Sequence, residues 1–354
     1  MAANGDIQVA RPSLLIAGQD DASLSEGLLN LAIIENTMGL YRCEALFGNL
    51  GTTNSSLGFL YFDRKKLEFG KSFQVKIGTD LIFDGSIMGL EAHFPQGEAP
   101  KFRVLAEDRF QDLRMTRRTR TFTDLQDGDV FQQIANEHGL SPDVDIAGPT
   151  YRVLAQVNQS DLAFLRERAR TVDAELWMDG SQLHAKSRTK RQDNTISLTH
   201  GAKLREFTVL ADLAGQRSSV FANGWDVAGK RALQYEANDS VLSAELNGGD
   251  SGASVLSATL GDRKESLAHL VPLTSQEAQS QAEAFFKLTA RRFITGRGVA
   301  ETDSNLRVGN LLDLQGLGPL FSGKYYLSEV RHRFDGVRGI RTEFSVERPG
   351  LGKP

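Results

Sequence analysis

Two glycine-rich segments contain the residue types of phosphate-binding or catalytic loops. Segment 318–325 reads Gly-Pro-Leu-Phe-Ser-Gly-Lys-Tyr, which is close to a nucleotide-binding loop. That chemistry needs a Ser or Thr after the lysine to hold magnesium, and a helix N-terminus facing the phosphates. Here Tyr325 follows Lys324, and the chain continues with strand-forming residues. We therefore interpret the segment as a glycine turn between two strands.

The second segment, Gly-Asp-Ser-Gly at 249–252, matches the nucleophile loop of trypsin-like proteases. Ser251 would need a histidine and an aspartate positioned by a double barrel. His200 and Asp212 precede it, but neither lies in a recognisable context. The surrounding stretch is rich in Ser, Gly and Asn, which produces this motif by chance. We predict no catalytic residue here or elsewhere in the chain.

Metal and cofactor chemistry lacks support in the residue spacing. No two histidines stand at zinc-ligand spacing, and the single cysteine, Cys43, can form neither a thiolate cluster nor an internal disulfide. The histidines are His93, His138, His184, His200, His269 and His332. Among 45 acidic residues, no carboxylate pair stands out for glycoside cleavage. We predict no metal site and no cofactor.

The sharpest basic cluster consists of Arg114, Arg117, Arg118 and Arg120. Aromatic residues flank this cluster but do not alternate with it, as they do in single-strand nucleic-acid binders. The whole chain carries 41 basic and 45 acidic residues, a net charge of −4. This balance argues against nucleic-acid binding as a primary role. We interpret the cluster as a solvated or intersubunit face.

Composition indicates a soluble, globular, β-rich protein. The 354 residues are 40% hydrophobic and 24% charged, and no apolar run is long enough to span a membrane. There are 34 glycines and 9 prolines, which suits many tight turns and few rigid linkers. Residues 1–11 are polar, so we expect no signal peptide and no Sec export.

The first region alternates apolar and polar residues in the manner of β-strands. Segments 28–34 and 41–47 alternate around a short loop at 35–39, which predicts a hairpin. A helix over 24–34 is the competing interpretation, but Gly27 would interrupt it. Further strands are expected at 73–77, 81–87, 90–94 and 102–106.

The pattern changes near residue 106 and changes back near residue 200. In between we expect a helix ending at Gly139, a strand at 151–157, a helix over 161–171 capped by Ser160, and a returning strand at 175–179. Later we expect paired strands at 204–210 and 219–225, a loop at 237–262, and a helix over 274–295. Strands and turns fill 306–348.

The first and last β regions share a pattern that predicts an internal repeat. Each contains a glycine, an alternating strand, a glycine turn and a Phe-x-Gly element, beginning at Gly70 and at Gly309. The Phe-x-Gly elements are at 83–85 and 321–323. A hairpin with a five-residue connection precedes each region, ending near Gly39 or Gly215. Two copies are too few for a solenoid.

Several of these stretches resemble the late-control D proteins of contractile-tailed phages, which are related to the hub part of VgrG and of extracellular contractile injection systems. The stretch 151–166, with Ser-Asp-Leu-x-Phe at 160–164, is similar to the family pattern. So are Phe83-Asp84-Gly85-Ser86-Ile87, Arg120-Thr121-Phe122 with its following helix, and 309–332. The family pattern continues into a Gly-Ile turn, which residues 168–174 replace.

The resemblance implies two tail-tube-like β-barrels separated by a small α+β domain. The expected divisions are a flexible arm at 1–13, a first barrel at 14–105, the α+β domain at 106–200, and a second barrel at 201–354 with the inserted helix 274–295. It also implies a homotrimeric baseplate hub that joins a six-fold tail tube to a three-fold spike. Baseplate wedge proteins would be further partners, and the family implies no enzyme activity or cofactor.

Other interpretations lead to different expectations. A hub-associated cell-wall hydrolase would degrade peptidoglycan, and a generic β-rich binding module would be unrelated to tails. For the hub we expect assembly in the bacterial cytoplasm and then a place in a virion tail or extracellular particle. The residues after the last expected strand are few and rich in Pro and Gly. We therefore expect the spike to be a separate chain.

Overall fold

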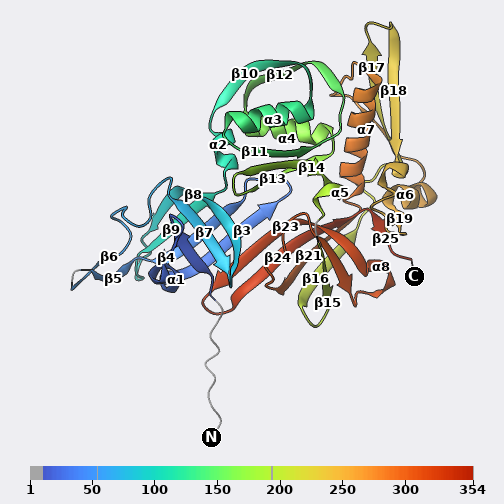
Figure 1. The fold of residues 1–354 in the computed structure, drawn as a ribbon. Helices are drawn as coiled ribbons and strands as arrows, with labels where there is room; N and C mark the ends of the chain where they lie inside the picture. Colours follow the sequence, from blue (N-terminus) through green and yellow to red (C-terminus); the bar gives the residue numbers. More distant parts are fainter. Residues whose placement is uncertain (1–10, 54, 193, 354) are drawn as a thin grey trace.

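The computed structural model describes residues 11–53, 55–192 and 194–353, and the fold is mainly β (Figure 1). Residues 1–10 of the expected arm at 1–13 lie outside this description. The described chain begins with Arg11, whose guanidinium donates a hydrogen bond to the Glu26 carbonyl at 3.2 Å. Strand β1 begins two residues later, at Ser13. None of the helices in these ranges is long and apolar enough to cross a membrane.

A 13-stranded sheet, built by two separate regions of the chain, forms the centre of the molecule. The first half-sheet contains β1 (Ser13–Ile16), β2 (Gln19–Asp20), β3 (Leu28–Asn36), β4 (Arg42–Gly48), β7 (Ser72–Ile77), β8 (Asp80–His93) and β9 (Lys101–Glu107). The second half-sheet contains β15 (Thr195–Thr199), β16 (Leu204–Ala211), β21 (Ile294–Glu301), β22 (Leu311–Gln315), β23 (Gly323–Asp335) and β24 (Gly339–Arg348). In Figure 1 they are the blue-to-cyan and the mostly orange-to-red strands.

The two half-sheets are continuous rather than two separate closed barrels. The strand order is β16-β21-β24-β23-β3-β4-β9-β8-β7-β1-β2, with β22 on β23 and β15 on β22. The link is the antiparallel pair β3–β23. It forms because β22 pairs only with the first part of β23, up to Tyr326, and leaves the second part for β3. The sequence pattern indicated the strands but not this junction.

The expected internal repeat is confirmed in the order of strands. In chain order, β1, β3, β4, β7, β8 and β9 correspond to β15, β16, β21, β22, β23 and β24. Every pair of neighbouring strands in the first set recurs in the second. The pairs β1–β7, β7–β8, β8–β9, β4–β9 and β3–β4 correspond to β15–β22, β22–β23, β23–β24, β21–β24 and β16–β21. One pair differs in direction, since β1–β7 is antiparallel and β15–β22 is parallel.

The repeat extends to the registers of the strands. The β8–β9 ladder shifts between Ile87 and Gly89, and β23–β24 shifts between Leu327 and Glu329. The β3–β4 ladder shifts between Leu28 and Asn30, and β16–β21 between Leu204 and Glu206. Such irregularities are positional features of a ladder, so their coincidence aligns the two halves residue by residue.

This alignment corrects two sequence expectations. Gly85 lies opposite Phe73, and its counterpart opposite Leu312 is Tyr325, so the Phe-x-Gly elements are not equivalent. The expected hairpin of 204–210 with 219–225 is also wrong. The partner of β16 is β21, because an insertion between Ala211 and Ile294 separates the two strands of the true hairpin.

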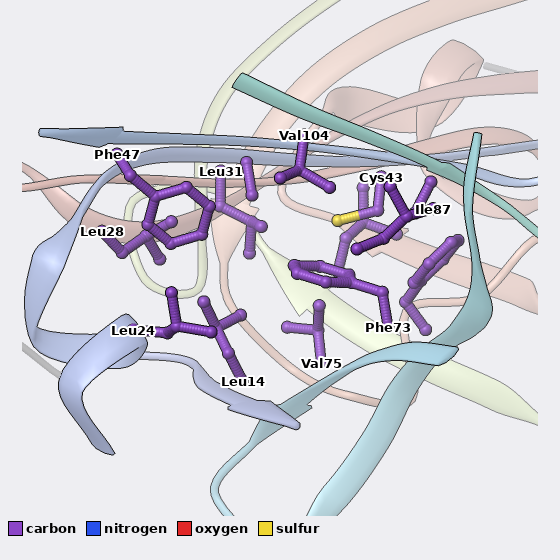
Figure 2. Close-up of a cluster of buried hydrophobic side chains, with 14 of the residues drawn as sticks. Leu14, Leu24, Leu28, Leu31, Cys43, Phe47, Phe73, Val75, Ile87 and Val104 are labelled. Atoms are coloured by element: carbon purple, nitrogen blue, oxygen red, sulfur yellow. The ribbon is translucent and has the colours of Figure 1, made fainter. Parts of the chain in front are cut away.

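Each half-sheet packs one face on its own hydrophobic core. Figure 2 shows the first core, where side chains from β3, β4, β7, β8 and β9 meet Leu14 and Leu24. Leu24 comes from the short helix α1 (Ala22–Gly27), so the helical alternative for 24–34 holds only for its first residues. The predicted hairpin of β3 and β4 is confirmed. The hairpin of β5 (Leu50–Thr53) and β6 (Ser56–Phe59) projects beside this core.

A small α+β unit sits across the two half-sheets (Figure 1). It contains α2 (Phe110–Arg114), β10 (Arg117–Gln126), α3 (Asp127–Glu137), β11 (Ser141–Asp145), β12 (Thr150–Ser160), α4 (Asp161–Thr171), β13 (Ala174–Asp179), β14 (Gln182–Ser187) and α5 (Arg188–Arg191). Ser160 caps α4 as predicted, since its hydroxyl accepts the Ala163 N–H at 3.3 Å. The unit has its own core. β15 was expected in this unit but pairs with β22 in the sheet.

The insertion in the second half-sheet forms a further layer. It contains β17 (Ser219–Asp226), β18 (Arg231–Asn238), the 3-10 helix η1 (Asp239–Leu242), β19 (Asp250–Ser251), α6 (Gly252–Leu260), β20 (Lys264–Leu267) and α7 (Ser275–Ala290), while α8 (Gly318–Phe321) and β25 (Gly350–Leu351) lie nearby. The expected loop at 237–262 contains α6, because Ser251 caps a segment that buries Ala253 and Leu256. Helix α7 is shorter than 274–295, because Ile294 already belongs to β21.

Candidate functional site

The half-sheets join at a seam, which we define as β3 paired with residues 329–335 of β23. Phe334 faces Leu31 and His332 faces Ile33 across this pair. All four side chains are buried, and Phe334 is only 1% exposed. His332 Nδ1 lies 2.9 Å from the Thr342 hydroxyl. Burial, together with the charge of Arg307, lowers the pKa of His332 to about 4, so this imidazole is neutral at pH 7.

A buried charge pair lies at one end of the seam. The Glu35 carboxylate is 2.5 Å from Nε of Arg307 and accepts the Val308 N–H at 3.3 Å. Burial alone would lower the pKa of Arg307, but the charge of Glu35 outweighs it and the pKa is raised. Because Glu35 is buried, loss of Arg307 would leave an unpaired charge inside the protein.

A second buried network ties the α+β unit to both half-sheets. Glu175 on β13 contacts Arg188 at 3.1 Å and Arg191 at 2.9 Å, and it accepts the Tyr326 hydroxyl. Arg191 also donates to the Tyr41 hydroxyl at 2.7 Å. Burial would raise the pKa of Glu175, but the two guanidinium groups lower it. Tyr41 precedes β4 and Tyr326 lies on β23, so three parts of the fold meet at one carboxylate.

Each half-sheet also has a long strand with a stretch that lacks a second neighbour among the described strands. On the first, the backbone contacts of β8 on the β7 side end at Ile87, so residues 88–93 have β9 alone beside them. On the second, β16 has β21 as its only neighbour. Large apolar side chains are exposed at both places, with Phe94 at 62% and Leu210 at 59%. Free strand edges present unpaired backbone donors and acceptors, which is where sheets associate.

The face of the sheet opposite the cores is polar across both halves. Alternate residues along the strands lie on this face, because successive side chains point to opposite sides. We call it the polar face; its members include Glu206, Thr208, Arg297, Glu343, Ser345, Glu329, Arg331, Arg333, Arg42, Glu44, Arg103 and Glu91. Cross-strand ion pairs span it, such as Arg333 with Glu343 at 3.1 Å and Arg103 with Glu91 at 3.4 Å. The face therefore carries charges of both signs in a mixed pattern.

The arginine cluster of the sequence is mostly paired within the α+β unit. Arg120 contacts Glu137 at 2.6 Å and Asp161 at 2.8 Å, and Arg118 contacts the same two carboxylates. Burial would raise the pKa of Asp161, but hydrogen bonds from His138 and Gln156 and the two arginine charges lower it. Arg114 pairs with Glu107 and Arg117 with a backbone carbonyl. The cluster thus fastens β10 to α3 and α4.

The two motif-like segments have local structural contacts. Ser251 caps α6, accepts the Ser254 N–H at 3.0 Å and donates to Asp239 at 2.9 Å. Lys324 lies in β23, opposite Asp313, and a strand follows it where a phosphate-binding loop would have a helix. Within the described ranges, no three His, Cys, Asp or Glu side chains are grouped to hold a metal ion.

The sequence did not predict the two free strand edges, which are the strongest candidates for contact with another chain. Segment 90–94 was expected as a strand and 204–210 as half of a hairpin. Which strand flanks each of them depends on contacts between distant parts of the chain. Alternation at 90–94 predicts a strand, but a strand pattern alone does not show which side of that strand lacks a partner.

Comparison with known proteins adds the following likenesses. A prophage MuSo2 43 kDa tail protein from Shewanella oneidensis shares 13% identity and a TM-score of 0.70, covering 96% of this chain and 98% of that one. A tail protein from Neisseria meningitidis MC58 shares 13% identity and a TM-score of 0.67, with 97% of each chain covered.

The E. coli c3393 protein, described as a component of the type VI secretion system, shares 12% identity and a TM-score of 0.57, covering 96% of this chain and 79% of that one. At such identities these likenesses establish a shared fold. No curated protein matches the sequence. A family model for the Alg8 N-terminal domain matches residues 55–335, and by this match the chain belongs to the Alg8 N-terminal domain family.

Proposed function

We propose that the chain is a structural subunit of a baseplate hub in a contractile tail or injection machine. Three copies form a ring in which their six half-sheets stand side by side. The ring converts the three-fold symmetry of a spike into the six-fold symmetry of a tail tube. A late-control D or VgrG-like hub has this role, and the proposal extends it to this chain.

The observation that carries the proposal is the repeat of one half-sheet within the chain. The two copies have the same strand order and are joined edge to edge, and each leaves a stretch of strand with a single described neighbour, on β8 and on β16. Contacts that repeat head to tail generate either closed rings or open filaments. The fold likeness to two tail proteins over nearly their whole length supports the closed ring in a tail.

The polar face supplies the surface that a channel would need. The polar faces of all copies would line the same channel. The channel would then be filled with water and lined by charges of both signs. A tail tube protein would dock on one rim of the ring and a spike protein on the other, with wedge proteins outside. The assembly would belong to a virion tail or extracellular particle, built in the bacterial cytoplasm.

We further propose that the role is not enzymatic. Ser251 and Lys324 have structural contacts that account for them, and the fold relatives are a tail protein and a component of a secretion system. A peptidoglycan zymogram of the purified chain tests this directly. Clearing of the gel by the purified chain would favour the cell-wall hydrolase instead.

The hub itself is tested by copy number in the assembled particle. The chain is co-expressed with the tube and spike proteins of its own gene cluster, and the purified complex is examined by native mass spectrometry and cryo-electron microscopy. We expect three copies in one ring. One copy or six copies at that position would refute the hub assignment.

A further inference from the structure

The seam shows the strand pairing by which two of these half-sheets join. It pairs β3 of the first with residues 329–335 of β23 in the second. The counterpart of β3 is β16, and the counterpart of β23 is β8. Among the described strands, β16 has β21 alone beside it, and the outer part of β8 has β9 alone beside it. The chain therefore exposes the two halves of a contact that it already makes once internally.

We propose that β16 of one copy pairs antiparallel with residues 89–94 of a second copy, which are the outer part of β8 and the residue that follows it. This interface repeats the seam between chains and rests on the proposed ring. The repeat fixes its register, with these facing residues: Gly89 with Asp212, Leu90 with Ala211, Glu91 with Leu210, Ala92 with Val209, His93 with Thr208 and Phe94 with Phe207. The seam pairs that supply this register run from Glu329 with Asn36 to Phe334 with Leu31.

Burial differences between equivalent residues support the pairing. Phe334 is buried in the seam, whereas its equivalent Phe94 is mostly exposed. Leu31 is buried as well, whereas its equivalent Phe207 is only partly buried. Large aromatic side chains facing each other across a strand pair stabilise a sheet. The proposed register brings Phe94 and Phe207 together and covers both.

Backbone groups beside the free edge are already arranged as they are in the seam. The Gly309 N–H donates to the Leu327 carbonyl at 3.0 Å, and its equivalent Gly70 donates to Ile87 at 2.8 Å. In the seam, the next carbonyl, Ser328, accepts the Thr37 N–H at 3.2 Å. The equivalent carbonyl on the free edge is that of Met88. In the proposed interface the Leu213 N–H of the second copy would donate to it.

No buried charge opposes the proposed pairing. Arg307 neutralises the buried Glu35, while the residue equivalent to Arg307, counted from the paired glycines, is Glu68. In β16 the counterpart of Glu35 is Ala211, which is neutral. The edge of β16 therefore fits β8 without an uncompensated charge.

Disulfide trapping tests the register. The double variant Glu91→Cys with Leu210→Cys places both thiols on the polar face, directly opposite each other in the proposed interface. Facing residues of paired strands have Cα atoms about 4.5–5.5 Å apart, within the range a disulfide needs. We expect covalent dimers and trimers of the chain after mild oxidation of the assembled particle. Native Cys43 is buried and serves as the background in all variants.

Two matched variants make the result interpretable. Arg331→Cys with Ile34→Cys is the equivalent pair in the seam, so it should close a disulfide within one chain whatever the assembly state. Glu91→Cys with Glu206→Cys is four residues out of register, about 13 Å along the strand, and should not crosslink. Crosslinking by this control, or none by the first pair while the seam pair closes, would overturn the proposed register.

The same particles separate this inference from the hub itself. Three copies per ring without the predicted crosslink would refute the interface and leave the hub standing. A ring stoichiometry other than three would refute the hub, and the interface with it. A second variant, Phe94→Asp, should weaken assembly by about tenfold or more, because Phe94 would be a buried aromatic contact. Leu57→Asp, on the exposed β5–β6 hairpin, should leave assembly unchanged.

Discussion

The first and second half-sheets share a strand order but fill their cores differently. In the first, Leu31 and Val104 pack near Cys43 and Ala45. In the second, the equivalent positions hold larger and smaller residues: Phe207, Phe344, Gly296 and Gly298. A Cβ on Gly296 would collide with the Phe207 ring, and one on Gly298 with the Phe344 ring. The larger aromatic residues on β16 and β24 thus occupy the space that the glycines on β21 leave free.

The same comparison separates what residue type decides from what the neighbour decides. The equivalent positions 94 and 334 are both phenylalanine, yet only Phe334 is buried, because only its edge has a partner strand. Exposure at Phe94 is therefore a property of the edge and not of the residue. Experiments that change equivalent positions in parallel can measure this difference.

The largest expected contrast is between Phe334→Ala and Phe94→Ala in the isolated chain. Phe334→Ala should lower the free energy of unfolding by about 3–5 kcal/mol, because it empties a packed site. Phe94→Ala should change it by about 1 kcal/mol or less, because that ring is mostly in solvent and loses only its contacts with Phe59 and Phe62. Urea unfolding at one protein concentration measures both. Equal losses in the free energy of unfolding would show that Phe94 is as tightly packed as Phe334.

A second contrast concerns charge. Arg307→Ala should cost about 3 kcal/mol, because it leaves Glu35 buried without its partner. At the equivalent position, Glu68→Ala removes only a solvent-exposed pair with Arg64 and should leave the stability almost unchanged. The double variant Arg307→Ala with Glu35→Gln should recover part of the loss. Thermal unfolding of the four proteins gives the comparison, and no recovery in the double variant would argue against a buried charge as the cause.

Acid should weaken the seam and not the free edge, because His332 has Ala92 as its equivalent. The folded pKa of His332 is about 4, below the value of 6.5 for an ordinary histidine. The unfolded chain therefore binds the proton first, and stability present above pH 6.5 is lost as pH falls toward 4. The slope is at most about 1.4 kcal/mol per pH unit. Arg307 and Asp303 are the charged groups acting on this ring.

The variant His332→Asn isolates the contribution of His332 to the pH dependence of stability. Asp108 also titrates in this pH range, because burial raises its pKa to about 7, although backbone hydrogen bonds from Tyr41 and Phe110 oppose the rise. Stability from that group is present below pH 3.8 and is lost as pH rises through 7, so its slope has the opposite sign. Unfolding free energies from pH 4 to 8 should differ in slope between the natural protein and His332→Asn. Identical slopes would show that His332 does not titrate in the seam.

Core exchange between the halves gives a smaller effect. Gly296→Ala should destabilise by about 1–3 kcal/mol through overpacking against Phe207. Adding Phe207→Leu, the residue of the first half-sheet, should restore part of that loss, so the two changes are not additive. Chemical unfolding of the single and double variants measures the coupling. Simple addition of the two losses would show that these positions do not share one core site.

The smallest effects are expected at the two motif-like segments. Ser251→Ala removes the cap of α6 and should cost about 1 kcal/mol. Lys324→Ala, and Asp84→Ala at its equivalent, should each change stability by less than about 0.5 kcal/mol. Thermal shift assays are sufficient for these comparisons. A loss of assembly with Lys324→Ala at unchanged stability would assign that lysine a contact outside the chain.

Local patterns in the sequence predicted what local interactions determine. The β3–β4 hairpin and the capped helix α4 follow from alternation and from Ser160. The partner of β16 was missed because 212–293 intervene before β21, and nothing in strand alternation indicates such a separation. The seam was missed for a related reason. Its register depends on β22 ending early along β23, which is a property of strand lengths in three dimensions.

The matched ladder irregularities have a mechanical consequence. A bulge bends its strand and increases the local twist, so each half-sheet is bent at the same two points by the same device. Repeating units that bend equally and join with one geometry accumulate curvature in one direction. A sheet extended by such joints traces a constant arc instead of a flat plate. The radius of any tube that it encloses would then be encoded in four bulges rather than in the length of any strand.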